Sequence, residues 1–182
     1  MKITSILSMI DVTAPIVGAE IGVWDGSLSK YLLDNQPNLI LHMIDLWQPW
    51  TPKDKTYIAD DDIMCSTSAD RFDQIYQDVI KLVEPFGLRA VINRDDSIQV
   101  AATCDDDYFD FVFVDAEHSE TALALDIAAW WPKVRPGGWL GGHDYEHPDF
   151  PGVTKAVNTF AENINAAIEV VDYSCWFIGK KR

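Results

Sequence analysis

Basic residues are scarce in this sequence. Its 182 residues include 14 Lys and Arg against 29 Asp and Glu, which gives a formal net charge of -15. Binding to a phosphate backbone needs a basic face, so this balance argues against nucleic acid as a partner. The densest acidic run, CDDDYFD at residues 104–110, is typical of a solvated loop rather than a metal site, and we assign it no function.

Cysteine is also rare, and long apolar runs are missing. Cys65, Cys104 and Cys175 lie far apart with no CxxC pair, which indicates neither a zinc site nor a disulfide framework and favours free thiols in a reducing compartment. Polar residues interrupt the apolar run within residues 1–18, so this segment makes a poor secretory signal, and no other stretch is apolar enough to span a membrane. We therefore expect a soluble cytoplasmic protein with no membrane partner.

The rest of the composition predicts one folded domain. Hydrophobic residues make up 48% of the chain and aromatic residues 12%, and a chain of 182 residues can bury a sizeable core as a single unit. No internal repeat, low-complexity segment or linker interrupts it. We interpret residues 1–182 as one domain.

Alternating strand and helix patterns predict an α/β fold. Strands are expected at residues 15–23, 39–47, 89–93, 109–116 and 137–145, the last one after a turn at residues 136–138. Helices are expected at residues 27–35, 69–87, 97–104, 119–131 and 152–164, and residues 167–174 and 175–181 can close as a hairpin. This order implies a parallel sheet covered on both faces, with ligands beyond the carboxyl ends of its strands.

The stretch AEIGVWDGSLSKYL at residues 19–32 runs from a strand into a helix through two glycines. Gly22 and Gly26 lack a Cβ, so a ligand can approach the backbone there, and Ser27 begins the helix where N–H groups are unpaired. The spacing differs from the GxGxxG of dinucleotide folds, and Glu20 would repel a phosphate. A ligand with a cationic amino acid group and no phosphate fits this turn better.

Acidic residues also follow three further predicted strands. Asp45 ends the second strand, where a carboxylate can accept both hydroxyls of a ribose, and Asp96 follows the third, where it can accept from an adenine amino group. Asp115 ends the fourth strand. Each alone is more simply a helix N-cap or a loop carboxylate. Together with Glu20, these residues place an acid at four strand ends, which favours a shared binding site.

From Ile16 to its end, the chain resembles the class I S-adenosylmethionine-dependent methyltransferases. The resemblance rests on the glycine turn, on the acidic strand ends and on the segments VDAEHSE, PGGWLGGHDY and PGVTKAV. The similarity is greatest to the small-molecule O-methyltransferases of the macrocin and catechol type, the methyltransferase domain 24-like group. The resemblance implies a Rossmann-like fold with a mostly parallel seven-stranded sheet, helices on both faces and a C-terminal hairpin. It also implies S-adenosylmethionine as the cofactor, bound by Glu20, Gly22, Gly26, Ser27, Asp45, Asp96, Ser97 and Asp115.

Methyl transfer to oxygen requires an activated hydroxyl, and two sets of residues are candidates for this catalytic task. A hard divalent ion prefers oxygen ligands, and Asp115, His143 and Asp144 end adjacent predicted strands, so they are candidate ligands for Mg²⁺ or Mn²⁺. His143 stands where the family has an acidic residue, and a histidine hydrogen-bonded at the sheet edge is its alternative role. His118 resembles in position the lysine base of catechol-type enzymes and is the candidate base, with a loop histidine before the Ser119 N-cap as the alternative.

The connection at residues 47–67 is long for a link between a strand and a helix, which is typical of functional loops. Trp47, Trp50 and Tyr57 are candidates for an apolar wall or a sugar-stacking platform above the transferred methyl. Four other tryptophans are expected in the core or at an interface, since large aromatic side chains are mostly buried. They are Trp130, Trp131, Trp139 and Trp176.

These observations predict a methyltransferase that acts on a hydroxyl of a small molecule, a sugar or a phenol, with divalent metal assistance as an open option. Two alternatives remain. One is a methyltransferase-like module that binds cofactor or a partner without catalysis, and the other is an oxidoreductase that uses a nicotinamide cofactor. The sequence leaves the oligomeric state open, and a homo-oligomer is among the alternatives.

Overall fold

The computed structural model describes residue 6 and residues 15–57, 66–172 and 174–182. Within these ranges a seven-stranded sheet has the order β3-β2-β1-β4-β5-β7-β6. β1 to β5 are parallel, and β7 pairs antiparallel with β5 and β6. The predicted Rossmann-like sheet with its C-terminal hairpin is confirmed. The strands are β1 (Ile16–Ile21), β2 (Leu39–Asp45), β3 (Ala90–Arg94), β4 (Phe109–Val114), β5 (Val134–Gly142), β6 (Glu169–Val171) and β7 (Cys175–Gly179).

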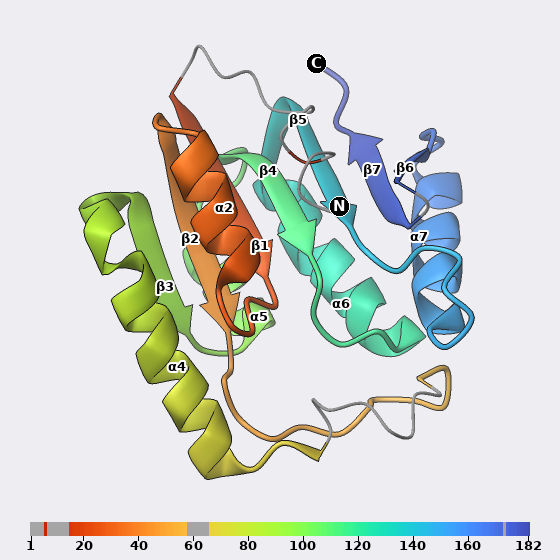
Figure 1. The fold of residues 1–182 in the computed structure, drawn as a ribbon. Coiled ribbons are helices and arrows are strands. Elements are labelled where there is room, and N and C mark those ends of the chain that lie inside the picture. The colour runs from red at the N-terminus through yellow and green to blue at the C-terminus, as the bar shows by residue number, and fades with distance from the viewer. Residues whose placement is uncertain (1–5, 7–14, 58–65, 173) are drawn as a thin grey trace.

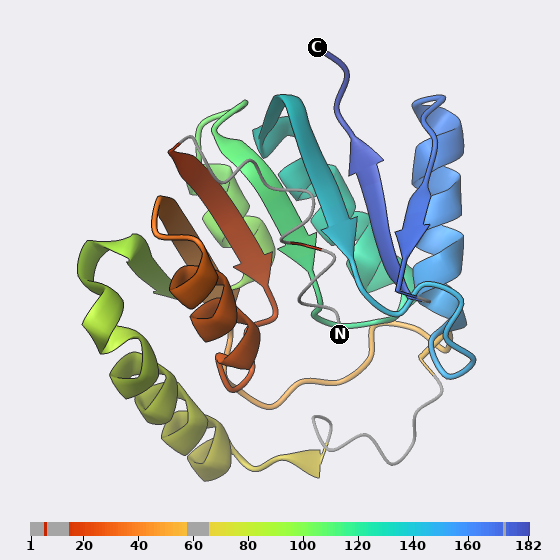
Figure 2. The same cartoon turned by 45° about the horizontal axis from the view of Figure 1, so that its top comes forward.

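Helices cover both faces of the sheet, as Figures 1 and 2 show. They include α2 (Ser27–Asn35), α4 (Ala69–Val83), α5 (Ser97–Thr103), α6 (Glu120–Trp130) and α7 (Pro151–Asn163). Side chains of α2 and α4 belong to one core cluster, and side chains of α5, α6 and α7 belong to another. Strands between two such layers must be apolar on both sides, which explains the buried sequence FDFVFV of β4.

The helix expected over residues 69–87 ends earlier than predicted. α4 stops at Val83 and continues as a 3-10 segment, η1 (Glu84–Arg89). A proline lies in the first turn of η1, and Gly87 has a φ of 57° and a ψ of -130°, which no helix contains.

The turn expected at residues 136–138 is wrong. These residues belong to β5, which begins at Val134. The pairing of β4 with β5 shifts register between Val134 and Trp139, and Gly137 in this interval has a φ of 84°. Pro136, Gly137 and Gly138 therefore form an irregularity inside β5, where the pairing with β4 is interrupted and resumes at Trp139.

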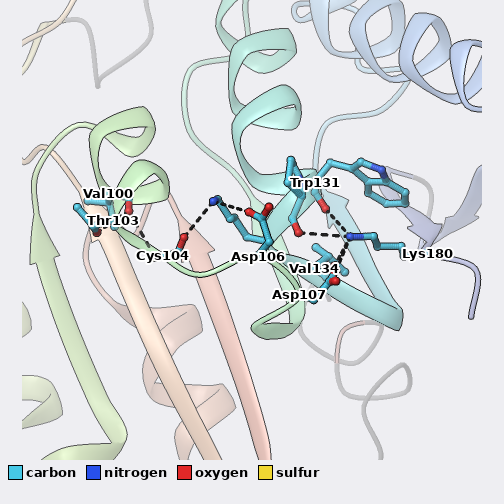
Figure 3. Close-up of polar contacts among 10 residues, drawn as sticks. Val100, Thr103, Cys104, Asp106, Asp107, Trp131, Val134 and Lys180 are labelled. Atoms are coloured by element: carbon cyan, nitrogen blue, oxygen red, sulfur yellow. Dashed lines mark hydrogen bonds and ion pairs between the residues drawn. The ribbon is translucent and has the colours of Figure 1, made fainter.

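The acidic run before β4 forms ion pairs and is not simply a solvated loop. Asp106 binds Lys133 at 2.7 Å, and Asp107 binds Lys180 at 2.8 Å. The Lys180 ammonium also donates to the carbonyl oxygen of Val134 at 2.6 Å (Figure 3). Because Lys180 follows β7, these bonds join the C-terminal hairpin to the amino ends of β4 and β5.

The described part of the chain contains no helix that is long and apolar enough to cross a membrane. Cys104 and Cys175 are free thiols, as expected, whereas Cys65 lies outside the described residues. The interpretation of residues 1–18 as a poor secretory signal also falls mostly outside them.

Candidate active site

The carboxyl ends of the parallel strands lie in register at one edge of the sheet. Ile21 of β1 pairs with Ile44 of β2 and Val114 of β4, and Val114 pairs with Gly142 of β5. The arrowheads of β1, β2 and β4 point toward this edge in Figure 1. A cavity of about 720 Å³ opens there, at the place where open α/β sheets bind ligands.

Most of the predicted site residues line this cavity. Those that do are Glu20, Gly22, Ser27, Asp45, Asp96, Ser97, Asp115, His118 and Asp144. Gly26 and His143 are not among the lining residues. The structure thus brings all the predicted cofactor residues except Gly26, and all the predicted catalytic and metal-binding residues except His143, to one cavity.

The glycine turn after β1 is shaped by a contact with the end of β4. Gly22 has a φ of 87°, and a Cβ placed there would overlap the carbonyl oxygen of Asp115 and lie 2.8 Å from Cα of Ala116. The space that a Cβ of Gly22 would occupy is therefore filled by backbone, so packing against β4 requires a glycine here in addition to any approach of a ligand. Gly26, with a φ of 75°, is the N-cap of α2.

Replacing Gly22 with alanine is expected to destabilise the fold strongly. The new methyl group would require a left-handed conformation and a shift of the β4 backbone, costs of about 1–2 and about 1–3 kcal/mol respectively. Gly87→Ala is the matched control, since Gly87 also has a positive φ but no atom within 4 Å of its added Cβ. Urea denaturation followed by circular dichroism measures both variants. Equal losses would show that the contact with Asp115 contributes nothing beyond the φ angle.

Glu20 is the most deeply buried acid of the cavity. Its side chain is 1% exposed, and the Ser29 hydroxyl of α2 donates a hydrogen bond to its carboxylate. Burial raises the pKa of Glu20 to about 8, against the opposing effect of Ser29, with further increases from Asp115 and Asp45. This raised pKa favours the protonated form of Glu20, whereas a cationic ligand group would favour its ionised form.

Asp45 fixes the glycine turn to the end of β2. Its Oδ2 accepts hydrogen bonds from the backbone N–H groups of Val23 and Trp24, both at 2.9 Å, and its Oδ1 accepts from the N–H of Trp47 at 2.7 Å. A carboxylate has about four lone-pair sites, so these three bonds leave it further accepting capacity. Asp45 thus organises the turn whether or not it also binds a ligand.

Two polar residues, Asp96 and Ser97, follow the end of β3. The Asp96 carboxylate caps α5, because its Oδ1 accepts from the N–H groups of Ile98 and Gln99. The Ser97 hydroxyl donates to Asp126 of α6 at 2.6 Å. Asp126 also lines the cavity and is a residue that sequence reasoning missed.

Asp115, His118 and Asp144 form a compact group between β4 and β5. His118 Nε2 lies 3.0 Å from Oδ2 of Asp144 and 3.6 Å from Oδ1 of Asp115. One ligand atom from each residue can be chosen so that all lie within 4.8 Å of one another, which is compact enough to hold a metal ion. Both ring nitrogens of His118 are buried without a well-directed hydrogen bond in the described structure. Two carboxylates and an under-satisfied imidazole fit a divalent cation.

Charge interactions dominate this group. Burial alone would lower the pKa of His118, but the carboxylates of Asp115 and Asp144 outweigh it and raise the pKa to about 9. Burial likewise raises the pKa of Asp144, yet contacts with His118 and His143 hold it well below its usual range. This raised pKa corrects the expectation that His118 titrates near neutral pH.

His143 lies outside this group. Its Nδ1 is 2.8 Å from Oδ1 of Asp144, and its Nε2 is 2.8 Å from the Ser174 hydroxyl. Both ring nitrogens thus face protein partners, which matches the alternative role of a histidine bonded at the sheet edge. The candidate metal ligands in the structure are Asp115, Asp144 and His118, whereas the sequence predicted His143 as the third ligand.

A family model described as a methyltransferase domain matches residues 19–145, from the glycine turn to the segment after β5. The chain belongs to this methyltransferase family. Methyltransferases of this fold use S-adenosylmethionine as the methyl donor, so the nicotinamide alternative loses its support. No curated protein matches the sequence.

Solved structures share the fold of this methyltransferase at low sequence identity. The O-methyltransferase NovP is 16% identical, with a TM-score of 0.66 over 92% of this chain and 73% of NovP. CalS11, a calicheamicin methyltransferase, is 12% identical, with a TM-score of 0.70 over 97% of this chain and 76% of its own. Fibrillarin from Aeropyrum pernix, with natively bound S-adenosylmethionine, is 12% identical, with a TM-score of 0.61 over 97% and 73%. At these identities the likeness shows a common fold.

Aromatic side chains of the methyltransferase enclose His118. The rings of Tyr57 and Phe150 stack on the imidazole, with centroid distances of 6.0 and 4.4 Å, and Trp50 meets Tyr57 edge to face at 5.5 Å. Tyr57, Phe150 and Trp50 also line the cavity, which supports the predicted apolar wall. Trp47 does not contribute, because it is fully buried in the core, where its indole N–H donates to the carbonyl oxygen of Trp24. Residues 58–65 of the predicted loop lie outside the described residues.

Proposed function

We propose that this methyltransferase transfers a methyl group to a hydroxyl oxygen of a small molecule, a sugar or a phenol. The observation that carries the proposal is the position of Asp115, His118 and Asp144, which line the same cavity as the glycine turn. Such a group can hold an ion that binds an acceptor oxygen and lowers the pKa of its hydroxyl. NovP, described as an O-methyltransferase, and CalS11, described as a calicheamicin methyltransferase, have the same fold and support this choice.

The cofactor is proposed to lie across the ends of β1, β2 and β3. Its methionine ammonium would approach Glu20 beside Gly22 and Ser27, which line the cavity next to the glycine turn. Its ribose would reach the accepting capacity that remains on Asp45. Its adenine would then lie near Asp96 and Ser97, on the far side from the Asp115 group. This direction points the sulfonium methyl toward β4.

Activation of the acceptor is proposed to involve the carboxylate and imidazole group. Asp115, Asp144 and His118 would hold a divalent ion such as Mg²⁺ or Mn²⁺, which when bound would lower the pKa of an acceptor hydroxyl. Asp115 would also border the methionine end of the cofactor, because it contacts the backbone beside Gly22. The rings of Tyr57 and Phe150 stack on His118 and restrict its imidazole, whose Nε2 lies 3.0 Å from Asp144.

The test of this function is a product analysis with isotopically labelled S-adenosylmethionine and a panel of phenols and sugars. Carbon NMR of the product distinguishes an O-methyl group from an N-methyl or C-methyl group. Transfer to nitrogen or carbon would refute the proposed acceptor atom. A cofactor-dependent thermal shift without turnover on the whole panel would favour the non-catalytic alternative.

The lining of the cavity also predicts the charge of the acceptor. Among the described residues, it contains one lysine, Lys53, against nine carboxylic acids. They are Glu20, Asp25, Asp45, Asp95, Asp96, Asp115, Glu117, Asp126 and Asp144. Such a cavity favours cations and repels anions, since low-dielectric walls strengthen both effects. The cationic sulfonium cofactor suits it, and so would a neutral or cationic acceptor.

Three catechols that differ in charge test this expectation. We expect kcat/KM to be at least about tenfold lower for 3,4-dihydroxybenzoate than for 3,4-dihydroxybenzyl alcohol, with 3,4-dihydroxybenzylamine at least as good as the alcohol. Methyl transfer from labelled cofactor measures all three compounds. Added salt should reduce the difference in kcat/KM among the three compounds, because it screens the lining carboxylates. Equal use of the benzoate and the alcohol would contradict charge selection.

A further inference from the structure

The segment at residues 48–57 crosses the cavity without a helix or strand of its own. It leaves β2, passes beyond the ends of β1 and β4, and reaches the starts of α6 and α7 (Figures 1 and 2). Trp50 and Tyr57 of this segment line the cavity. An irregular segment keeps a fixed position through its contacts with neighbouring elements, since it belongs to no hydrogen-bonded ladder. The contacts that attach it therefore decide where these two aromatic side chains lie.

Asp54 and Thr56 attach the segment to the first turn of α6. The N–H groups in the first turn of a helix have no partner within the helix. Those of Glu120 and Thr121 donate to Thr56 Oγ1 at 2.7 Å and to Asp54 Oδ2 at 2.8 Å. Asp54 Oδ1 accepts the hydroxyl of Thr56 and also its N–H, the latter at 2.7 Å. We refer to Asp54 and Thr56 together as the α6 clasp.

The charge of Asp54 suits the clasp. Hydrogen bonds from Thr121 and Thr56 hold the pKa of its carboxyl group well below the usual range. The amino end of a helix also favours a negative charge, because the helix dipole is positive there. Asp54 therefore remains an ionised acceptor throughout the neutral pH range.

The start of α7 packs directly on the clasp. A Cβ on Gly152 would lie 2.4 Å from Thr56 Oγ1 and from the backbone nitrogen of Glu120, and 2.9 Å from the carbonyl oxygen of His118. A side chain at this position would therefore push α7 away from the clasp. This contact explains the glycine in the segment PGVTKAV, which the methyl-transfer chemistry leaves without a role.

The clasp lies next to the residues that enclose the reacting end of the cavity. Tyr57 directly follows Thr56, is 8% exposed and stacks on the His118 imidazole at a centroid distance of 6.0 Å. His118 in turn lies two residues before Glu120, whose N–H donates to Thr56. The bond between Thr56 and Glu120 thus fixes Tyr57 relative to His118. Trp50 meets Tyr57 edge to face, so its position depends on the same attachment.

We propose that Asp54 and Thr56 are positioning residues for the methyl acceptor. Neither lines the cavity, so they act through Tyr57 and Trp50, which form its aromatic wall. The cofactor residues lie at the ends of β1 to β3, away from the clasp. Loss of the clasp should therefore raise KM for the acceptor more than it lowers kcat, and should leave cofactor binding unchanged. The inference rests on the proposed function in that an acceptor binds beside this wall, but not on the acceptor atom or on a metal.

Thr56→Val is the informative variant, because valine has nearly the shape of threonine but no hydroxyl. We expect KM for 3,4-dihydroxybenzylamine to rise at least about tenfold, while the affinity for S-adenosylhomocysteine stays within about twofold of the native value. Hydrogen exchange of the backbone amides at residues 48–57 should become faster. Asp54→Asn should act like Thr56→Val, because one amide oxygen cannot replace two carboxylate oxygens that accept from Thr56 and Thr121.

Two further variants separate positioning from a general loss of stability. Thr56→Ser keeps the hydroxyl and should restore both the native KM and the native exchange rate. Thr103→Val makes the same substitution as Thr56→Val at the end of α5, where the hydroxyl donates to the carbonyl oxygen of Val100 at 2.8 Å. It should leave KM and the exchange of residues 48–57 at their native values.

Three results would overturn the inference. Thr56→Val with faster exchange but native KM would show that the wall moves without effect on the acceptor. Equal exchange in the native protein and Thr56→Val would show that the clasp does not attach the segment. Equal impairment of Thr56→Ser and Thr56→Val would exclude the hydroxyl as the cause. Methylation of the amino nitrogen of 3,4-dihydroxybenzylamine would instead refute the proposed transfer to oxygen, and the comparison of KM values would still decide the role of the clasp.

Discussion

Replacement of His118 by alanine is expected to lower kcat about 100-fold or more, because it removes one of the three residues proposed to hold the ion that lowers the pKa of the acceptor hydroxyl. His118 Nε2 lies 3.0 Å from Asp144, and the ring stacks on Tyr57 and Phe150, which also line the cavity. The affinity for S-adenosylhomocysteine should change little, because the cofactor residues lie across β1 to β3. Single-turnover kinetics and titration calorimetry measure the two effects separately.

His147→Ala provides the control for this prediction. His147 also stacks on Phe150, at 4.9 Å, but its side chain is 37% exposed and it is not among the cavity-lining residues. Its loss should leave kcat near the native value. If His118→Ala retained native kcat, His118 would have no role in the transfer. A loss of cofactor affinity as large as the loss of kcat would assign His118 to the binding of S-adenosylmethionine.

Removal of divalent ions is expected to abolish most turnover while cofactor binding persists. The ligand atoms of Asp115, His118 and Asp144 lie close enough for one ion, and the two carboxylates contribute most of its attraction. Asp115→Asn should reduce kcat/KM by at least about 100-fold and should exceed Asp144→Asn, because Asp115 also packs beside the cofactor turn at Gly22. Kinetics in EDTA, followed by restoration with individual ions, tests the metal directly.

The identity of the effective ion follows from the imidazole in the group. Manganese, or another ion that tolerates a nitrogen ligand, should support more activity than calcium does. Asp149→Asn is the control for the carboxylate variants, since Asp149 is exposed and lies in the same segment after β5. Full activity in EDTA would remove the metal from the mechanism.

The fold was predictable because each strand has a strong local signal. Apolar runs such as that of β4 and the helix that begins at Ser27 identify their elements without reference to distant residues. The line of acids at the strand ends was predictable for the same reason, since parallel strands bring their carboxyl ends to one edge. The irregularity in β5 was not, because proline and glycine there are equally compatible with a turn.

The side chains that complete the site depend on tertiary packing. Ser29 meets Glu20 and Asp126 meets Ser97 only because α2 and α6 pack beside particular strand ends, and the spacing of these residues in the sequence reveals neither contact. The exchange of His143 for His118 has a backbone cause. Asp144 has a φ of 61°, a left-handed conformation that turns the chain directly after β5. Nothing in the dipeptide His-Asp indicates that turn.

The close packing of Gly22 against the end of β4 constrains how the acceptor range of this protein can diverge. Because no gap separates the two strand ends, the spacing between the donor site proposed at β1 and the acceptor group proposed at β4 and β5 is set by the sheet and is poorly suited to adjustment by mutation. Residues 48–57 and 145–150 instead supply the aromatic walls. A library confined to these two segments should therefore yield variants with new acceptors and an unchanged preference for the methyl donor.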